Sequence, residues 1–152
     1  QNYRTLFHRV ASWLQPNGRL FAQILCHREH AYSMTARQDD WMGRTFFTGG
    51  TMPSADLFLY FQEDLVVDNQ WSIDGRHYSK TLDAWLALMD ANAPQVRKVF
   101  SDTYGDAKAR QKVVDWRTFY IFCSESFGLA GGNEWMVAHY TFRRRDGTPE
   151  HQ

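Results

Sequence analysis

The sequence predicts an α/β fold, in which a few strands alternate with helices. Residues 2–14 place apolar side chains at helical spacing, and residues 19–26 (RLFAQILC) form a short apolar run. Pro16-Asn17-Gly18 lies between them and is typical of a turn. A helix, a Pro/Gly turn and a buried strand make half of an α/β unit. At 152 residues the chain is long enough for a single domain with its own core.

The first helix and the first strand are each defined by their apolar pattern. The helical stripe consists of Tyr3, Leu6, Phe7, Val10, Trp13 and Leu14. Residues 19–26 lack a strict alternation of apolar and polar side chains, which is typical of a strand buried on both faces. We therefore expect both faces of this strand to be covered.

The polar segment that follows, HREHAYSMTARQDD, predicts a loop. His27 and His30 have H-x-x-H spacing, with Glu29 between them and Asp39 and Asp40 downstream. A zinc site needs three or four ligands, and this segment offers no obvious further partner. We therefore favour a histidine-bearing loop over a pocket and predict no metal site.

Residues 39–62 (DDWMGRTFFTGGTMPSADLFLYFQ) form the most distinctive stretch of the chain. The Gly49-Gly50 pair predicts a tight turn, and Pro53 and Ser54 suit the start of a helix. That helix would be apolar on nearly all sides, so we expect it to be largely covered. The stretch lies against either a substrate or a neighbouring helix, and the pattern alone leaves both open.

The remaining elements follow in order. Residues 65–73 predict a strand, Asp74-Gly75 a tight turn, and the residues from about Ser79 a helix that breaks at Asn92 and restarts after Pro94. A long helix is expected over residues 107–127, and a strand over residues 134–142. No internal repeat or linker interrupts them.

Charge and cysteine content exclude several classes of protein. The 17 basic and 17 acidic residues balance, so no electrostatic footprint for nucleic acid is present. Cys26 and Cys123 lie far apart and predict free thiols of a reducing compartment. No apolar run approaches the length of a membrane span, and we expect a cytoplasmic protein.

Aromatic residues are unusually abundant: 6 Trp, 7 Tyr and 11 Phe. Such a content is typical either of a pocket lined with rings or of an aromatic-rich core, and composition alone leaves both open.

Acid–base candidates are present, although no phosphate loop, dinucleotide fingerprint or nucleophile elbow occurs. They are His27, His30, His77, Tyr78, Glu125 and His139. Glu125 lies near the apolar face of the 107–127 helix, where a carboxylate needs a partner or a shifted pKa. Glu125 either faces a functional cavity or forms a structural hydrogen bond.

Five blocks of sequence resemble one family over almost the whole chain and in the same order. They are FFTGGTMPSADLFLYFQ (46–62), WSIDGRHYSKT (71–81), TYG (103–105), DWRTF (115–119) and GGNEWMVAH (131–139). The family is that of the S-adenosylmethionine-dependent methyltransferases related to cyclopropane fatty acid synthase, and the more similar branch is that of the coclaurine-type N-methyltransferases. The FFTGGTMPSA block is the most specific of the five.

The resemblance implies a C-terminal portion of a class I (Rossmann-like) methyltransferase. Residues 19–26, 65–71 and 134–142 would be its fifth, sixth and seventh strands, with the seventh inserted antiparallel between the other two. Residues 1–152 would form one partial domain, in which helices at about 39–62 and 79–127 make a cap over the acceptor substrate. The cofactor, S-adenosylmethionine, would be bound mainly by residues upstream, so the chain alone is expected to be inactive.

Few site residues can be transferred from the family. Tyr78 matches the tyrosine that holds bicarbonate in cyclopropane synthases, whereas Gln23 stands where those enzymes have a histidine. This difference favours methyl transfer to nitrogen over cyclopropanation. The acceptor-pocket aromatics would be Phe46, Phe47, Trp116, Phe119, Tyr120 and Phe127, together with Tyr78. Tyr78 and Glu125 are the weak catalytic candidates.

The expected function is therefore N-methylation of an amine, to which this chain contributes the acceptor pocket. One alternative is cyclopropane synthase-type modification of lipid acyl chains. The other is a noncatalytic truncated module that binds an apolar ligand or a partner chain. The strand at 19–26 would expose an apolar edge, so we also expect a homo-oligomer or association with a partner through that edge.

Overall fold

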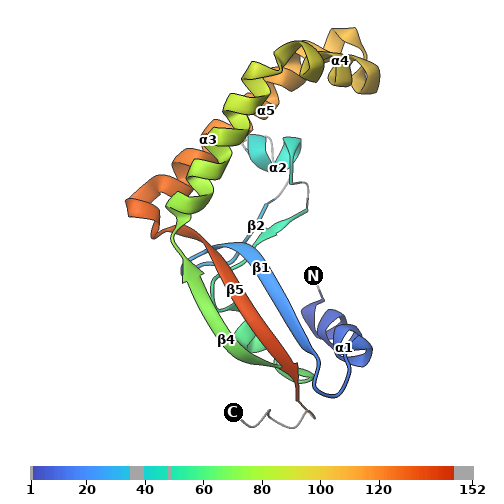
Figure 1. The fold of residues 1–152 in the computed structure, drawn as a ribbon, viewed down its shortest axis with the longest axis vertical. Coiled ribbons are helices and arrows are strands. Elements are labelled where there is room, and N and C mark those ends of the chain that lie inside the picture. Colours follow the sequence, from blue (N-terminus) through green and yellow to red (C-terminus); the bar gives the residue numbers. More distant parts are fainter. Residues whose placement is uncertain (1, 35–39, 48, 146–152) are drawn as a thin grey trace. The chain divides into compact units, whose positions relative to one another are not determined.

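The computed structural model describes residues 2–34, 40–47 and 49–145. The chain divides into two compact units, which are described separately below (Figure 1). The sheet unit comprises Gln1–Tyr32, Met52–Ile73 and Val137–Gln152. The helical unit comprises Ser33–Thr51 and Asp74–Met136.

The sheet unit is built on a three-stranded sheet in the order β1-β5-β4. These strands are β1 (Arg19–His27), β4 (Leu65–Ile73) and β5 (Trp135–Arg144). The last strand runs antiparallel to β4, with Leu65 opposite Arg144 and an irregularity in the register between Val67 and Asn69. The expectation that the last strand inserts between the two earlier ones is confirmed (Figure 1).

The expectation that β1 is buried on both faces is wrong. Exposure alternates over most of the strand: the side chains of Arg19, Phe21 and Gln23 are exposed, and those between them are partly covered. Phe21 keeps 57% of its surface exposed. Only the far end of β1, at Cys26 and His27, is buried.

The core of the sheet unit is aromatic. Helix α1 (Tyr3–Trp13) begins at Asn2, whose side-chain oxygen accepts a hydrogen bond from Thr5 N at 3.0 Å. From α1, the Phe7 ring contacts Phe58 at 5.4 Å and Phe142 at 5.3 Å between centroids. The predicted apolar stripe is only partly buried, since Leu6 and Trp13 are exposed.

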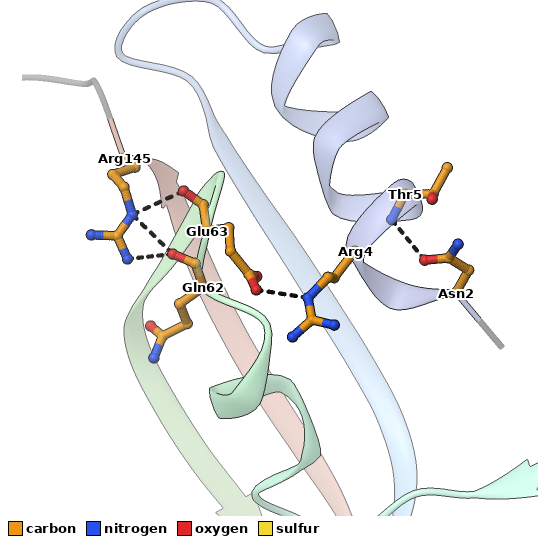
Figure 2. A network of polar contacts seen from close by, with 6 residues as sticks. All are labelled: Asn2, Arg4, Thr5, Gln62, Glu63 and Arg145. Atoms are coloured by element: carbon orange, nitrogen blue, oxygen red, sulfur yellow. Dashed lines mark hydrogen bonds and ion pairs between the residues drawn. The ribbon is translucent and has the colours of Figure 1, made fainter.

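A polar network ties α1 and the end of β5 to the segment that precedes β4 (Figure 2). Arg4 Nε donates to Glu63 Oε1 at 2.8 Å. Arg145 Nε donates to the carbonyl oxygens of Gln62 and Glu63, each at 2.9 Å. These side chains are largely exposed, so the network orients the chain more than it stabilises it.

The helix expected after Pro53 is absent. Thr51–Met52 (β3) pairs with Tyr32–Ser33 (β2), and the segment continues beside β1: His27 N donates to Pro53 O, and Ala55 N donates to His27 O, both at 2.9 Å. A single 3₁₀ turn, η1 (Leu57–Tyr60), follows. Phe58 is buried there, but Leu59 and Tyr60 are exposed, so the expectation of a covered helix is wrong. Pairing with β1 competes with helix formation and prevails.

The helical unit consists mainly of α3 (Gly75–Ala91), α4 (Ala93–Tyr104) and α5 (Asp106–Gly128), with a short α2 (Trp41–Thr45). The break near Pro94 and the long helix are confirmed, α5 extending one residue beyond the predicted range at each end. Helices α3 and α5 pack along each other (Figure 1). Between them, Ser79 contacts Ser124 at 2.9 Å, and Ser124 Oγ donates to Asp83 Oδ1 at 2.6 Å.

The tight turn expected at Asp74-Gly75 is instead the start of α3. The Asp74 carboxylate caps the helix by accepting from Arg76 N at 2.8 Å. The first residue of the helix is a glycine, Gly75, because a β-carbon there would overlap the carbonyl oxygens of Phe127 and Trp135. The η2 turn (Leu129–Gly132) that follows α5 contains three successive residues with positive φ, including Ala130 at 49°.

The hydrogen bonds at the start of α3 lower the pKa of Asp74. Hydrogen bonds from the Arg76 side chain, and then from its backbone, lower the pKa of Asp74 to about 2. A lowered pKa in the folded state stabilises the fold above the unfolded value, and that contribution is lost as the pH falls from about 4 to about 2. We expect the carboxyl carbon of Asp74 to titrate near pH 2 in NMR, and Arg76→Gln to raise that midpoint. A midpoint near 4 in the unmodified chain would contradict the assignment.

In the part of the chain that the structure describes, no helix is long and apolar enough to cross a membrane.

Candidate functional site

Four of the predicted pocket aromatics meet in the helical unit. Phe46 and Phe47 follow α2, and Trp116 and Phe119 lie on α5 one turn apart. The Phe46 ring is 4.6 Å from Phe119 and 5.2 Å from Trp116, and the Phe47 ring is 5.8 Å from Phe119. The segment after α2 therefore packs its two phenylalanines against a single face of α5.

These rings line a cavity of about 340 Å³, within the range of small-molecule sites. We call it the ring cavity. Its lining residues are Thr45, Phe46, Phe47, Tyr104, Lys112, Trp116 and Phe119. Thr45, Tyr104 and Lys112 were not predicted as site residues, although Tyr104 lies in the TYG block that carries the resemblance. Lys112 lies one helical turn before Trp116, and this spacing could have indicated that Lys112 lines the same cavity.

Among the residues that the structure describes, Lys112 is the only charged one that lines the ring cavity. Its ammonium nitrogen lies 5.6 Å from the centroid of the Tyr104 ring and 3.4 Å from Asp115 Oδ2. The carboxylate of Asp115 is nearly buried and also accepts from Gln111 Nε2 at 2.9 Å. The cation is thus held between an aromatic face and a carboxylate.

The other predicted aromatics continue the row of rings without lining the ring cavity. Tyr120 is 5.9 Å from Trp116 and 6.3 Å from Trp85. Trp85 contacts Tyr78 at 6.1 Å, and Tyr78 contacts Phe127 at 4.8 Å. Burial, with smaller contributions from Cys123 and Tyr120, raises the pKa of Tyr78. Tyr78 therefore keeps its proton at neutral pH and can donate a hydrogen bond.

A second, larger cavity of about 710 Å³ also borders Trp116. Its lining residues are Trp85, Leu88, Met89, Asn92, Gln95, Val96, Val99, Phe100, Trp116 and Tyr120. Trp116 is the wall that the two cavities share. Trp85 was not among the predicted pocket residues, because which helix it faces depends on how α3 packs on α4 and α5.

Glu125 lies outside both cavities. Its side chain is exposed on α5, so the premise that it sits on the apolar face and needs a partner is wrong. The neighbouring positions Ser124 and Phe127 are the buried ones on this part of the helix. One residue along an α-helix turns the side chain by about 100°, which is enough to move Glu125 to the solvent side.

The His27 ring forms hydrogen bonds with the backbone. Its Nδ1 accepts hydrogen bonds from Glu29 N at 3.0 Å and His30 N at 2.9 Å, which closes the turn after β1. The His27 and His30 rings stack at 5.2 Å. Among the described residues, no group of three or more histidine, cysteine or acidic side chains could hold a metal ion. Asp39 lies outside the described residues.

Cys26 and Cys123 are free, as predicted. Burial raises the pKa of each thiol to about 11. At neutral pH both thiols are therefore protonated and poor nucleophiles. His139, another acid–base candidate, contacts Gln23 Oε1 at 3.0 Å on the sheet.

The abundant aromatic residues form both an aromatic core and a cavity lined with rings. In the sheet unit the rings form the core, as the contacts of Phe7, Phe58, Tyr140 and Phe142 show. In the helical unit they form a continuous row, which lines the ring cavity at one end and reaches Phe127 at the other.

The strand order β1-β5-β4, the antiparallel last strand and the adjoining helices define the C-terminal part of a class I (Rossmann-like) methyltransferase. A solved structure of coclaurine N-methyltransferase bound to N-methylheliamine and SAH matches with a TM-score of 0.85 at 35% identity. That match covers 94% of this chain and 42% of the other. The chain belongs to the mycolic acid cyclopropane synthetase family, whose model matches residues 1–127.

Curated relatives come from the branch that the sequence resembles. An (S)-coclaurine N-methyltransferase of Thalictrum flavum subsp. glaucum is 36% identical over 95% of this chain. A pavine N-methyltransferase of the same plant is 34% identical, again over 95% of the chain. The chain spans 42% of the length of each of these relatives, and the part it matches is their C-terminal half.

Proposed function

We propose that this chain is the segment of an S-adenosylmethionine-dependent methyltransferase that forms the acceptor pocket for N-methylation of an amine. The ring cavity is the observation that carries the proposal. Its five aromatic lining residues all lie within blocks that carry the family resemblance. The coclaurine N-methyltransferase whose solved structure is 35% identical to this chain is bound to N-methylheliamine and SAH.

The chemistry suits such a cavity. Methyl transfer from a sulfonium to an amine is an in-line displacement that depends chiefly on positioning. Flat aromatic walls orient a planar acceptor without hydrogen bonds to its ring. We propose Phe46, Phe47, Trp116 and Phe119 as the acceptor walls, and Tyr120, Tyr78 and Phe127 as the continuation of the site.

The cofactor and the base are proposed to come mainly from residues upstream of this chain, since no glycine-rich cofactor loop occurs in it. Within the chain, Tyr78 is the better of the two catalytic candidates, because it is partly buried and its ring contacts that of Phe127. Glu125 remains the weaker one, because its side chain is exposed.

Three further properties are proposals of the same kind. Residues 1–152 form one partial methyltransferase domain, to whose cap residues at about 39–62 and 79–127 contribute. The free thiols Cys26 and Cys123 favour the cytoplasm, where thiols stay reduced. The end position of β1 in its sheet and the exposed Phe21 favour a homo-oligomer or association through that strand.

A chimera tests the proposed function. The whole chain replaces the matching C-terminal half of the Thalictrum coclaurine N-methyltransferase, and transfer of a labelled methyl group from S-adenosylmethionine to 1,2,3,4-tetrahydroisoquinoline is measured. We expect transfer, and a loss of about 10-fold or more in Trp116→Ala because the acceptor loses a positioning wall. The matched control is Trp13→Ala in the sheet unit, where the side chain is 73% exposed, and it should leave the rate unchanged.

A chimera that folds and binds S-adenosylmethionine but methylates no amine would contradict N-methylation. The family description supports a second candidate, cyclopropanation of lipid acyl chains, for which Tyr78 would hold bicarbonate. The same chimera distinguishes it: unsaturated phospholipid would gain a methylene group, and the rate would depend on bicarbonate. Ligand binding without any transfer would instead favour a noncatalytic module.

A further inference from the structure

The ring cavity carries its own positive charge. Lys112 lines it from α5, and about 31% of the lysine side chain is exposed. The other lining residues, Thr45 and five aromatics, are uncharged. Of the described residues, Lys112 is therefore the one ionic group that a ligand in the cavity meets.

In the ion pair between Lys112 and Asp115, the lysine lines the cavity and the carboxylate does not. Asp115 is not a lining residue, its side chain is only 11% exposed, and its Oδ1 is already bonded to Gln111. The carboxylate thus sits behind the lysine, 3.4 Å from its nitrogen. The pair acts on a ligand as a dipole whose ammonium end is the nearer one.

The Lys112 ammonium also lies over one of the aromatic rings that line the cavity, that of Tyr104. Aromatic faces attract cationic ligands when they are free. The face of Tyr104 is occupied by the Lys112 ammonium, 5.6 Å from the ring centroid. A cationic ligand would lose that face and would lie close to a like charge.

We propose that Lys112 is a specificity-determining residue, which makes the ring cavity select the neutral form of an aromatic amine and reject its cationic forms. The inference rests on the proposed function, since it assigns the charge state of the ligand at the same site. Only the neutral amine has a free lone pair on nitrogen to attack a methyl group. The same repulsion disfavours retention of a cationic methylated product.

A matched pair of ligands isolates the effect of charge. The permanent cation N,N-dimethyl-1,2,3,4-tetrahydroisoquinolinium and its neutral carbon isostere 2,2-dimethyltetralin have the same shape, and neither can titrate. Binding of each to the 152-residue chain is followed through the indole NH signal of Trp116 in NMR, which reports on this wall and needs no catalysis. We expect the neutral probe to bind about 10-fold more tightly than the cation.

Two substitutions of Lys112 then assign the preference. Lys112→Arg keeps the charge and should keep the ratio of affinities. Lys112→Met keeps the length, removes the charge and frees the Tyr104 face, so the ratio should fall to about one or reverse. If Lys112→Met does not fold because Asp115 loses its partner, Lys112→Met combined with Asp115→Asn removes the pair together and should give the same loss.

The outcomes separate this inference from the proposed function. Binding of both probes with a ratio that Lys112→Met leaves unchanged would overturn the role of Lys112 and leave the acceptor pocket standing. If neither probe shifts the Trp116 signal in any variant, the acceptor pocket itself is overturned, and the inference with it.

Discussion

Gly75→Ala is expected to destabilise the helical unit by at least about 3 kcal/mol, because the new methyl group would overlap backbone atoms that have no room to move. A β-carbon at this position would clash with the carbonyl oxygens of Phe127 and Trp135, and it would lie 3.3 Å from the carbonyl oxygen of Gly132. These three carbonyls belong to the end of α5, the η2 turn and the start of β5. Backbone, unlike a flexible side chain, cannot turn aside.

The matched control is Gly128→Ala, in the last turn of α5. Its nearest neighbour would be Ser79 Oγ at 3.7 Å, an ordinary contact, and its φ of −79° suits any residue. Alanine should there be neutral or stabilise by up to about 1 kcal/mol. Urea unfolding followed by far-UV circular dichroism measures both variants. Equal stabilities for the two would show that the start of α3 is not closely packed against these carbonyls.

Phe142→Ala is expected to destabilise the sheet unit by about 3–5 kcal/mol. The Phe142 side chain is fully buried, and its ring contacts Phe7 at 5.3 Å and both Phe58 and Tyr140 at 5.9 Å. Removing the ring leaves a cavity where α1, η1 and β5 meet. A loss of this size is a large fraction of the total stability of a typical domain.

Phe21→Ala is the control for that substitution, since Phe21 is on the same sheet but 57% exposed. We expect its effect to stay within about 1 kcal/mol, the scale of its edge contact with His139. Amide hydrogen exchange along β5 distinguishes the two variants locally. Protection of β5 that survives Phe142→Ala unchanged would show that the aromatic core does not hold this strand in the sheet.

The charge of Lys112 changes how the aromatic cavity is interpreted. Rings alone suggest a site for a cation, such as a sulfonium or a protonated amine. With Lys112 over Tyr104 and Asp115 behind it, the same rings suit a neutral aromatic ligand. One lysine on the correct face of a helix thus reverses the charge preference that composition would predict.

Much of the fold could be predicted from the sequence because its signals are local. The period of apolar residues locates α1, α4 and α5, and β-branched and aromatic runs locate β4 and β5. The two local errors, at Pro53 and at Asp74-Gly75, share a cause. In each, a partner distant in sequence (His27 for Pro53, the end of α5 for Gly75) decides the backbone conformation.

In the candidate site, too, some residues could be predicted from the sequence and others could not. By itself, the sequence determined the family and four rings of the cavity, since Phe46, Phe47, Trp116 and Phe119 all lie within blocks that carry the resemblance. Only the tertiary structure decided that Lys112 lines this cavity and that Glu125 does not. The physical reason is rotation and register: a shift of one residue turns a helical side chain by about 100°, and the packing of α5 against α4 and the segment after α2 selects which side chains meet.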